Sequence, residues 1–455
     1  MPTARLSALD ASFLEIESPT AHMHVGWVAT FLPPANGVRP TFEELRDHVA
    51  SRLWRAPRYR QRLAPVPLGL APPRWADDES FDVCNHILHS PARDLAEVAD
   101  MAMSVPLCRE RPLWELWIAD ELGDGRIGVV GKAHHCLVDG IAAVELASLM
   151  LDTEPDPPVP VPERWRPARP PGALDALGYG MRSLVRAELA VLGAPARLAR
   201  SPRRLLDLPD QARRAASVLV DTVDPAAPTP VLNEPISPLR RLALFERPLE
   251  DLQRVKRRFG TTLNDVLLAV CAGGVRDLFG TRGQPAIPLK TMVPVNVRGD
   301  EAAGDLGNQI SFIFVDLPCD EVDPVMRLER VHRATTARKR AGQPAVAGAA
   351  LRALGYTPPP VQHVAAHAAA SPRAYNLVIS NIPGPREPMY MRGCRMEAAH
   401  PVVPLSDGHS LSIGLTTIGA RACFGLYADR RTLPDADLVA ERVDLAVDEL
   451  LGVAE

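Results

Sequence analysis

Seven consecutive residues, His-His-Cys-Leu-Val-Asp-Gly at positions 134–140, carry the side chains best suited to chemistry in this chain. They bring two imidazoles, a thiol and a carboxylate close together. An imidazole has an unperturbed pKa near neutrality, so it can take a proton from a hydroxyl group and return it at working pH. The heptapeptide therefore predicts a general base.

The sequence around the heptapeptide places the histidines at the end of a strand. Residues 125–133 are typical of a strand and residues 141–150 of a helix. Successive side chains on a strand point to opposite faces, so His134 and His135 cannot both face one cleft unless the strand has already ended. We expect one imidazole to be the base and the other to be structural. A lone histidine in an apolar strand is more often a hydrogen-bonded core residue, but the tandem pair favours function.

The last two residues of the heptapeptide, Asp139 and Gly140, have structural interpretations as well as functional ones. An aspartate just before a helix caps free N–H groups, and it can also pair with an arginine and hold the loop that aims a histidine. Neither role makes Asp139 a proton acceptor. Gly140 carries no chemistry and would serve for backbone freedom or close approach.

The cysteines favour neither a thiol nucleophile nor a metal site. Cys136 follows His135 directly, and adjacent side chains on an extended chain point apart, whereas a Cys–His dyad needs them to meet. Neighbouring histidines rarely chelate one ion, and no cysteine or carboxylate cluster completes a metal shell. The seven cysteines are scattered and form no C-x-x-C pair, which fits a reducing cytosol. We expect no bound metal or cofactor.

Composition excludes several classes of protein. A chain of 455 residues suggests two or three domains, and 46% hydrophobic residues can fill substantial cores. The net charge of -4 gives no attraction to nucleic acid. Residues 1–20 lack the apolar segment of a signal peptide, and no stretch approaches the roughly 20 apolar residues that span a bilayer. We expect a cytoplasmic protein, and any membrane contact must be peripheral.

Proline-rich connectors divide the chain into three parts. Eight prolines lie between residues 154 and 171, and proline continues neither a helix nor a sheet ladder. We expect an α+β domain over residues 1–155, a Pro/Arg-rich helical linker over 156–238 and a second α+β domain over 239–455. In the first domain we expect strands at 24–32, 114–121 and 126–133, and helices at 41–54 and 94–105.

The second domain repeats the mixture of helices and strands without repeating the sequence. Helices are expected at 249–259, 262–279, 324–341, 347–369 and 435–451, and strands at 289–296, 309–317, 375–380, 409–418 and 420–428.

The linker carries eleven arginines between residues 164 and 214, against four acidic residues, with leucines interspersed. A basic amphipathic helix can lie on an anionic lipid surface. A helix packed on the body of the protein, with its arginines in solvent, explains the pattern equally well.

Six motifs in order carry a resemblance to a known family. The heptapeptide matches the HHxxxDG signature of acyltransferases related to chloramphenicol acetyltransferase. The whole chain resembles, more narrowly, the bacterial wax ester synthase/diacylglycerol acyltransferase family. The supporting motifs are LSALDASFLEIESPTAHMHVG at 6–26, PLWE at 112–115, Asn264-Asp265, VPVNVR at 293–298, LGNQIS at 306–311 and SNIPGP at 380–385. Two small departures, Cys136 where alanine is common and Ile382 where valine is common, leave the catalytic residues in place.

Each supporting motif also has a plain structural interpretation. Pro112, Leu113 and Trp114 lead into a strand, where Trp114 would be core. Thr261, Thr262 and Asn264 are all residues that start helices well, so Asn264 would be a helix cap. Ser380 and Asn381 would lead a strand into a tight turn.

The resemblance implies two chloramphenicol-acetyltransferase-like domains with a channel between them, which acyl-CoA and an acceptor alcohol enter from opposite sides. It implies that His135 removes the proton of the acceptor hydroxyl, without an acyl-enzyme, and that His134, Asp139 and Gly140 aim His135. Asn264 or backbone N–H groups are candidates for the oxyanion donor. The related acyltransferases place an arginine against the motif aspartate, so we expect an ion pair between Asp139 and Arg298.

The implied reaction is transfer of a long-chain acyl group from acyl-CoA to diacylglycerol, which yields triacylglycerol, with fatty alcohols as a further acceptor that yields wax esters. The alternatives are an acyltransferase for another hydroxyl, on a polyketide or a glycolipid, and a non-catalytic paralogue that binds lipid. The intact heptapeptide argues against the last of these. A condensation domain that forms amides is disfavoured by the full set of motifs.

Overall fold

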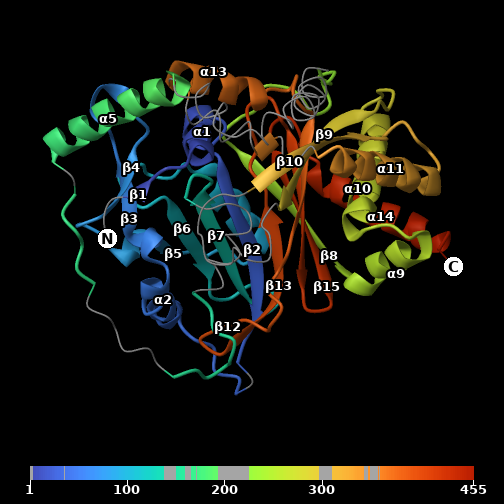
Figure 1. Cartoon of the computed structure of the whole chain (residues 1–455). Coiled ribbons are helices and arrows are strands. Elements are labelled where there is room, and N and C mark those ends of the chain that lie inside the picture. The colour runs from blue at the N-terminus through green and yellow to red at the C-terminus, as the bar shows by residue number, and fades with distance from the viewer. Residues whose placement is uncertain are drawn as a thin grey trace.

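The computed structural model describes residues 4–34, 36–137, 150–158, 165–170, 172–192, 225–296, 310–342, 347–348, 357 and 359–454. The described residues include two six-stranded sheets and one three-stranded sheet. Figure 1 shows the two large sheets next to each other, with a group of helices beyond the second sheet.

The first large sheet contains the strand that leads to the histidine pair. Its strands, in spatial order, are β12 (Tyr390–Met391), β13 (Cys394–Val402), β2 (His24–Leu32), β7 (Ile127–His134), β6 (Trp114–Ala119) and β5 (Ile87–His89). All eight residues of β7 are buried, because the sheet has apolar clusters on both faces. Helix α3 (Leu95–Ser104), which begins at the N-cap Asp94, packs against β7 and contributes to one of these clusters.

The second large sheet is built from residues after 239. Its strands, in spatial order, are β10 (Ile310–Leu317), β9 (Leu289–Asn296), β11 (Leu377–Ile382), β14 (Leu411–Ile418), β15 (Arg421–Asp429) and β8 (Arg240–Pro248). Helices α9 (Leu249–Phe259), α10 (Leu263–Thr281), α11 (Pro324–Arg340) and α14 (Ala436–Gly452) cover it. The largest apolar cluster of the described residues lies between these helices and the sheet.

The two large sheets meet at a pair of glycines. Gly414 of β14 and Gly425 of β15 are directly paired, and Pro401 of β13 lies against both. A Cβ atom on Gly425 would lie 2.2 Å from the Pro401 carbonyl oxygen, and one on Gly414 would lie 2.7 Å from the Pro401 ring. Only residues without a side chain permit this approach, so the contact between the sheets is built into the sequence.

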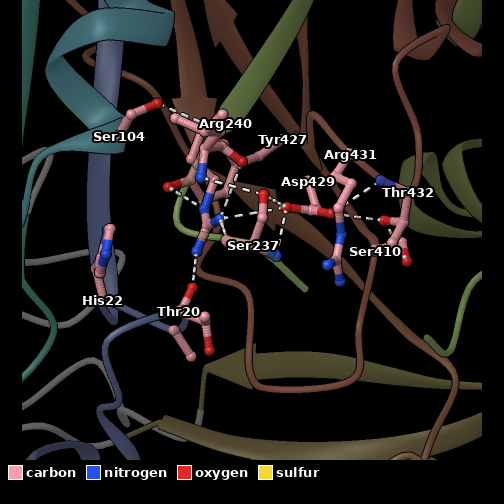
Figure 2. A network of polar contacts seen from close by, with 12 residues as sticks. Thr20, His22, Ser104, Ser237, Arg240, Ser410, Tyr427, Asp429, Arg431 and Thr432 are labelled. Carbon is pink, nitrogen blue, oxygen red and sulfur yellow. Dashed lines mark hydrogen bonds and ion pairs between the residues drawn. The ribbon is translucent and has the colours of Figure 1, made fainter. Parts of the chain in front are cut away.

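A buried arginine connects the two sheets through polar contacts (Figure 2). Arg240, at the start of β8, is 1% exposed. Its guanidinium donates to the carbonyl oxygens of Thr20, Ser237 and Leu239 and to the Tyr427 hydroxyl. Asp429 lies 3.7 Å away and accepts hydrogen bonds from the backbone N–H and hydroxyl of Ser237. The segment before β2 is therefore held by residues of the second sheet.

The remaining elements surround the first sheet. They are α1 (Ala8–Ile16), α2 (Phe42–Ala50), α5 (Ala173–Leu192) and α13 (Pro359–Ala369), the small sheet of β1 (Ala4–Arg5), β4 (Arg74–Asp77) and β3 (Gln61–Ala64), and the 3-10 turns η1 (Leu53–Arg55), η2 (Pro57–Arg60), η3 (Pro67–Gly69) and η4 (Val83–Asn85). Helix α1 packs on α13, and α5 packs on η3.

Most elements expected from the sequence are present with bounds that differ by a few residues. The helix expected at 41–54 ends at Ala50, where the chain turns into η1. Helix α13 begins at Pro359, and most of the preceding segment expected to be helical lies outside the described residues. Of the linker, only α5 falls within a described helix.

Three important elements were not expected. Helix α1 is short, β8 reads as a continuation of the connector, and β13 contains Glu397, two alanines and Pro401. Such residues disfavour a strand, but β13 pairs with β2 of the first sheet along its length, and tertiary context overrides β-propensity. Residues after 239 thus complete the first sheet, and the division into folding units at 155 and 238 stays a prediction.

Folding stability should depend on the protonation of the buried His48. Burial, together with the Arg52 guanidinium, lowers the pKa of His48 to about 3. In the unfolded chain His48 has its ordinary pKa near 6.5, whereas in the folded chain it stays neutral down to about pH 3. The free energy of unfolding is therefore highest above about pH 7 and falls as the pH drops toward 3. At pH 5 the loss from this one group is about 2 kcal/mol.

The measurement is urea unfolding between pH 5 and 7.5. His48→Gln keeps an acceptor for the Arg392 N–H that bonds to His48 Nδ1, and its stability should depend less steeply on pH than that of the wild type. His367→Gln, a change at an exposed histidine, is the control and should keep the wild-type slope. Equal slopes for His48→Gln and the wild type would contradict this assignment.

Candidate active site

The histidine pair lies where β7 ends, and neighbouring strands fix its backbone on both sides. His134 is the last residue of β7 and pairs with His24 of β2, and His135 lies in the turn that follows. The backbone N–H of His134 donates to the Leu113 carbonyl, and that of His135 donates to the Met23 carbonyl, both at 2.9 Å. The strand thus ends between the two histidines, which lets their side chains lie in different environments.

The His134 ring is buried, with 1% of the residue exposed. Its Nδ1 accepts a hydrogen bond from the Cys136 N–H at 3.0 Å, and its Nε2 lies 3.6 Å from Glu17 Oε2. Since Nδ1 is an acceptor, these contacts assign the proton of the neutral ring to Nε2, facing the carboxylate. His134 therefore closes the turn that carries His135.

Glu17 is the carboxylate beneath the pair. It also forms an ion pair with Arg109. Burial works to raise the pKa of Glu17, but hydrogen bonds and charge from His134 and Arg109 outweigh it and hold the pKa below its usual range. The carboxylate is therefore ionised at neutral pH and keeps the His134 ring oriented.

His135 is less buried than its neighbours. Residues 131–134, 136 and 137 are all buried, whereas His135 has intermediate exposure. The Phe13 ring stacks on the His135 ring, with 3.8 Å between centroids and an interplanar angle of 16°. Of the two imidazoles, His135 is the more exposed.

The Cys136 thiol is only 2% exposed. Burial raises its pKa well above the usual range, and the nearby carboxylates of Asp10 and Glu17 add to the effect. A thiol that stays protonated is a poor nucleophile. This environment agrees with the expectation that Cys136 takes no part in the chemistry.

Other basic groups lie under the histidine turn and are kept neutral or paired. His24 is 1% exposed, and neither of its ring nitrogens has a hydrogen-bond partner among the described residues. Burial lowers the pKa of His24 well below its usual range, and the Lys132 ammonium adds to this shift. Lys132 Nζ in turn donates to the Ala102 and Val105 carbonyls and lies 2.7 Å from Glu115.

The PLWE motif lies next to the histidine pair. Leu113 supplies the carbonyl that accepts from His134, and the Pro112 carbonyl accepts from the Trp114 N–H. The Trp114 indole N–H donates to the Tyr59 carbonyl at 2.8 Å, and its ring stacks on His86. Trp114 is thus a core residue in the apolar cluster beneath the site, and Leu113 sets the register of the strand that ends in the pair.

Asn264 and Asp265 lie in the first turn of α10. Thr262 is the N-cap, and Asp265 completes a capping box with it, so Asn264 is not the cap. Asp265 Oδ1 accepts from the Thr335 hydroxyl and Oδ2 lies 2.8 Å from His332 Nδ1, both on α11. Burial opposes the shift, but these hydrogen bonds lower the pKa of Asp265. Asp265 therefore joins two helices, while Asn264 is partly exposed.

Ser380 and Asn381 lie on β11 of the second sheet, paired with Gly414 and Leu415. The turn after them passes very close to β14, because a Cβ atom on Gly384 would lie 1.9 Å from the Thr417 carbonyl oxygen. A tight exit from the strand thus explains the glycine of SNIPGP. No contact of Ser380 or Asn381 with the histidine pair is found among the described residues.

Three of the expected site residues, Asp139, Gly140 and Arg298, lie outside the described residues. The ion pair between Asp139 and Arg298 remains a prediction. Among the described residues there is no group of three or more histidine, cysteine, aspartate or glutamate side chains able to hold a metal ion.

Sequence reasoning missed three residues that contact the pair, namely Phe13, Glu17 and Met23, and it missed Arg109, which pairs with Glu17. The first three lie within the segment 6–26 that carries part of the resemblance, but no periodicity or spacing connects that segment to position 134. Met23 has a left-handed backbone with φ of 51°, which is costly for a residue with a side chain. This conformation accompanies the contact of its carbonyl with His135.

Two mixed sheets that meet along their strands, with a histidine pair at the end of a central strand, define a chloramphenicol-acetyltransferase-like fold. The solved trichothecene 15-O-acetyltransferase from Fusarium sporotrichioides superposes with a TM-score of 0.64 at 13% identity, covering 99% of this chain and 94% of that one. The first condensation domain of the CDA synthetase superposes with a TM-score of 0.61 at 16% identity, covering 100% and 97%. These likenesses concern the fold alone.

Sequence comparison narrows the class. The model of the wax ester synthase/diacylglycerol acyltransferase catalytic domain matches residues 6–267, and the model of the WS/DGAT C-terminal domain matches residues 306–451. The chain belongs to the wax ester synthase/diacylglycerol acyltransferase family of acyltransferases.

Similar proteins align with this chain over nearly its whole length. A Mycobacterium tuberculosis protein named "Probable diacyglycerol O-acyltransferase tgs2" is 32% identical over 452 residues, with 97% of each chain covered. Another from that species, tgs1, is 30% identical, with 99% of this chain and 96% of that one covered. The solved wax ester synthase/diacylglycerol acyltransferase from Marinobacter aquaeolei VT8 is 27% identical, with a TM-score of 0.67 and 99% of both chains covered.

The contacts of Asp265 and Asn264 predict different phenotypes for neighbouring residues. Asp265→Ala removes the capping-box carboxylate that accepts from the Thr262 N–H and from the buried Thr335 hydroxyl, so it should lower the free energy of unfolding by about 1 to 3 kcal/mol. Asn264→Ala should change stability by less than about 0.5 kcal/mol. Urea unfolding measures both.

Steady-state kinetics of Asn264→Ala test its assignment as an oxyanion donor. Loss of such a donor should lower kcat about 10²-fold or more. A wild-type kcat would remove Asn264 from the candidates.

Proposed function

We propose that this protein transfers a long-chain acyl group from acyl-CoA to the free hydroxyl of diacylglycerol, which yields triacylglycerol. Fatty alcohols are a second class of acceptor, which would yield wax esters. The observation that carries the proposal is the half-buried His135 at the end of β7, in a chain related over its full length to proteins named as diacylglycerol O-acyltransferases. The names of those relatives supply the acceptor class, and the site supplies the base.

In the proposed mechanism His135 takes the proton of the acceptor hydroxyl as its oxygen attacks the thioester carbonyl. The C–S bond then breaks, and the proton passes to the departing CoA thiolate, so no acyl-enzyme forms. A positioned base contributes about 10² to 10⁴-fold. Bringing two bound substrates together must therefore supply much of the remaining acceleration.

The surroundings of the pair support His135 as the base. His134 is buried and already engaged with Cys136 and Glu17, and the Cys136 thiol is buried and protonated. Neither can meet a substrate without breaking the turn. We further propose that Asp139 pairs with Arg298 to hold the loop, that Gly140 allows its backbone geometry, and that Asn264 or backbone N–H groups stabilise the oxyanion.

Residues of the other motifs would support the substrates through the elements that carry them. We propose that Pro112, Leu113, Trp114, Asp265, Ser380 and Asn381 act by fixing the ends of β6, α10 and β11 around a channel. Acyl-CoA and acceptor would enter that channel from opposite sides, between domains formed by residues 1–155 and 239–455.

Helix α5 offers a surface for peripheral contact with lipid. Its inner face buries Ala176 and packs Tyr179 and Gly180 against Val66 and Leu70 near η3. Its outer face exposes apolar side chains spaced as one helical stripe, namely Leu174, Leu177, Met181 and Val185. A helix that is apolar on both faces, with one of them exposed, needs a second apolar partner.

Neighbouring groups favour an anionic lipid surface as that partner. Leu68 of η3, beside α5, is 87% exposed with a left-handed backbone, and Arg166, Arg169 and Arg182 are exposed on the same segment. None of the described helices is long and apolar enough to span a membrane. We propose a cytoplasmic protein that touches the inner face of the plasma membrane or lipid droplets through α5.

The decisive test of the reaction uses the purified chain with palmitoyl-CoA and either diolein or hexadecanol. Thiol release and ester product should appear together, and His135→Ala should lower kcat about 10²-fold or more. Cys136→Ala is the matched control and should stay within about twofold of the wild type. Wild-type turnover by His135→Ala would refute the mechanism. If no ester forms with diolein or with hexadecanol, the protein would be an acyltransferase for another hydroxyl or a lipid-binding paralogue.

Removing the apolar stripe should weaken lipid binding. The double change Leu174→Glu with Met181→Glu should lower partitioning onto phosphatidylglycerol vesicles by about tenfold or more. It replaces apolar side chains that would enter the lipid surface with charges that the anionic surface repels. Vesicle sedimentation measures the effect, with thermal unfolding to confirm the fold. Leu445→Glu, at an exposed leucine of α14, is the control, and equal binding by all three proteins would contradict the assignment.

A further inference from the structure

We propose that Phe13 is a positioning residue for proton transfer at His135, and that helix α1 holds both histidines of the pair. The inference deepens the proposed function and rests on it, because it assumes that His135 is the base. It adds a residue from the N-terminal helix, more than one hundred positions before the histidines.

The stack between Phe13 and His135 is nearly parallel. The ring centroids lie 3.8 Å apart and the planes are inclined by 16°. The Phe13 ring lies on the face of the imidazole and fixes its plane, while the lone pair of the basic ring nitrogen lies in that plane and so points away from the contact.

The same contact favours the charged form of His135. The face of a phenyl ring carries negative potential, so it attracts the imidazolium that forms as the hydroxyl proton is taken up. Phe13 also keeps water from that face of the ring, where water would otherwise compete for the charge. Phe13 should therefore both orient the His135 ring and stabilise the protonated form of His135.

Helix α1 is anchored at both ends. At its start, Ser7 and Asp10 form a capping box. At its end, the C-cap Glu17 faces His134 Nε2 and pairs with Arg109. One short helix thus contacts His135 through Phe13 and His134 through Glu17, so the two rings are held relative to each other.

Helix α13 supports α1 from outside. The two helices pack together, and His363 Nδ1 lies 2.8 Å from Glu15 Oε2. The charged groups that act on Cys136 in the turn are Asp10, Glu17, Arg58 and Arg109, and the buried His24 lies on the adjoining strand. Replacing Phe13 removes none of these charged groups, so the variants test the stack itself.

The variants for the test are Phe13→Leu, which keeps apolar volume but removes the aromatic face, and Phe13→Tyr, which keeps it. Phe42→Leu is the matched control, because Phe42 also contacts a histidine, His89, with 5.0 Å between centroids. Each purified full-length variant is assayed for kcat, for KM toward palmitoyl-CoA, for the pH dependence of kcat and for thermal unfolding.

Phe13→Leu should lower kcat about tenfold while KM stays within about twofold, because the stack acts on the base and not on substrate binding. The acidic midpoint of the kcat profile should fall by about half a pH unit, since the imidazolium loses its aromatic partner. Phe13→Tyr should recover most of kcat, and Phe42→Leu should match the wild type in both readouts.

A Phe13→Leu enzyme with a kcat within twofold of wild type and an unchanged pH midpoint would overturn the inference. Equal losses in Phe13→Leu and Phe13→Tyr would overturn it as well, since the aromatic face would then be irrelevant. His135→Ala separates the two levels. If it is inactive while Phe13→Leu is normal, only the role of Phe13 fails, whereas an active His135→Ala removes the proposed mechanism and this inference together.

Discussion

The hydrogen bonds of the buried Arg240 guanidinium are the interaction on which the arrangement of the candidate site depends. An unpaired charge inside a protein costs several kcal/mol, so the carbonyls of Thr20, Ser237 and Leu239 must stay in place around it. Thr20 belongs to the segment that leads through Met23 into β2, and Met23 supplies the carbonyl that holds His135. The second sheet thus holds the N-terminal segment that contacts the histidine turn.

The close contact between the two sheets also joins the N-terminal segment to the later part of the chain. Strand β13 comes from the later part of the chain, pairs with β2 and presses Pro401 onto Gly414 and Gly425 of the second sheet. Close packing of this kind resists small displacements. The residues that hold the histidines therefore come from both halves of the sequence, and neither half completes the first sheet alone.

Two adjacent histidines acquire unequal environments because the strand ends between them. His134 is buried and hydrogen-bonded to the turn that follows, while His135 is partly exposed and stacks on Phe13. The ionised Glu17 maintains this difference, because its charge fixes the tautomer of His134. Tuning of this kind needs groups from α1, β2 and the turn at once.

The sequence by itself determined the elements with clear periodicity, such as α9, α10 and β7, and the position of the histidines at a strand end. It also determined the family, because six motifs occur in order. Only the tertiary structure decided the strand character of β13, whose composition disfavours it, and the contacts of Phe13, Glu17 and Met23 with residues over one hundred positions away. Local pattern encodes local backbone preference, whereas such partners are chosen by packing and by the need to satisfy buried polar groups.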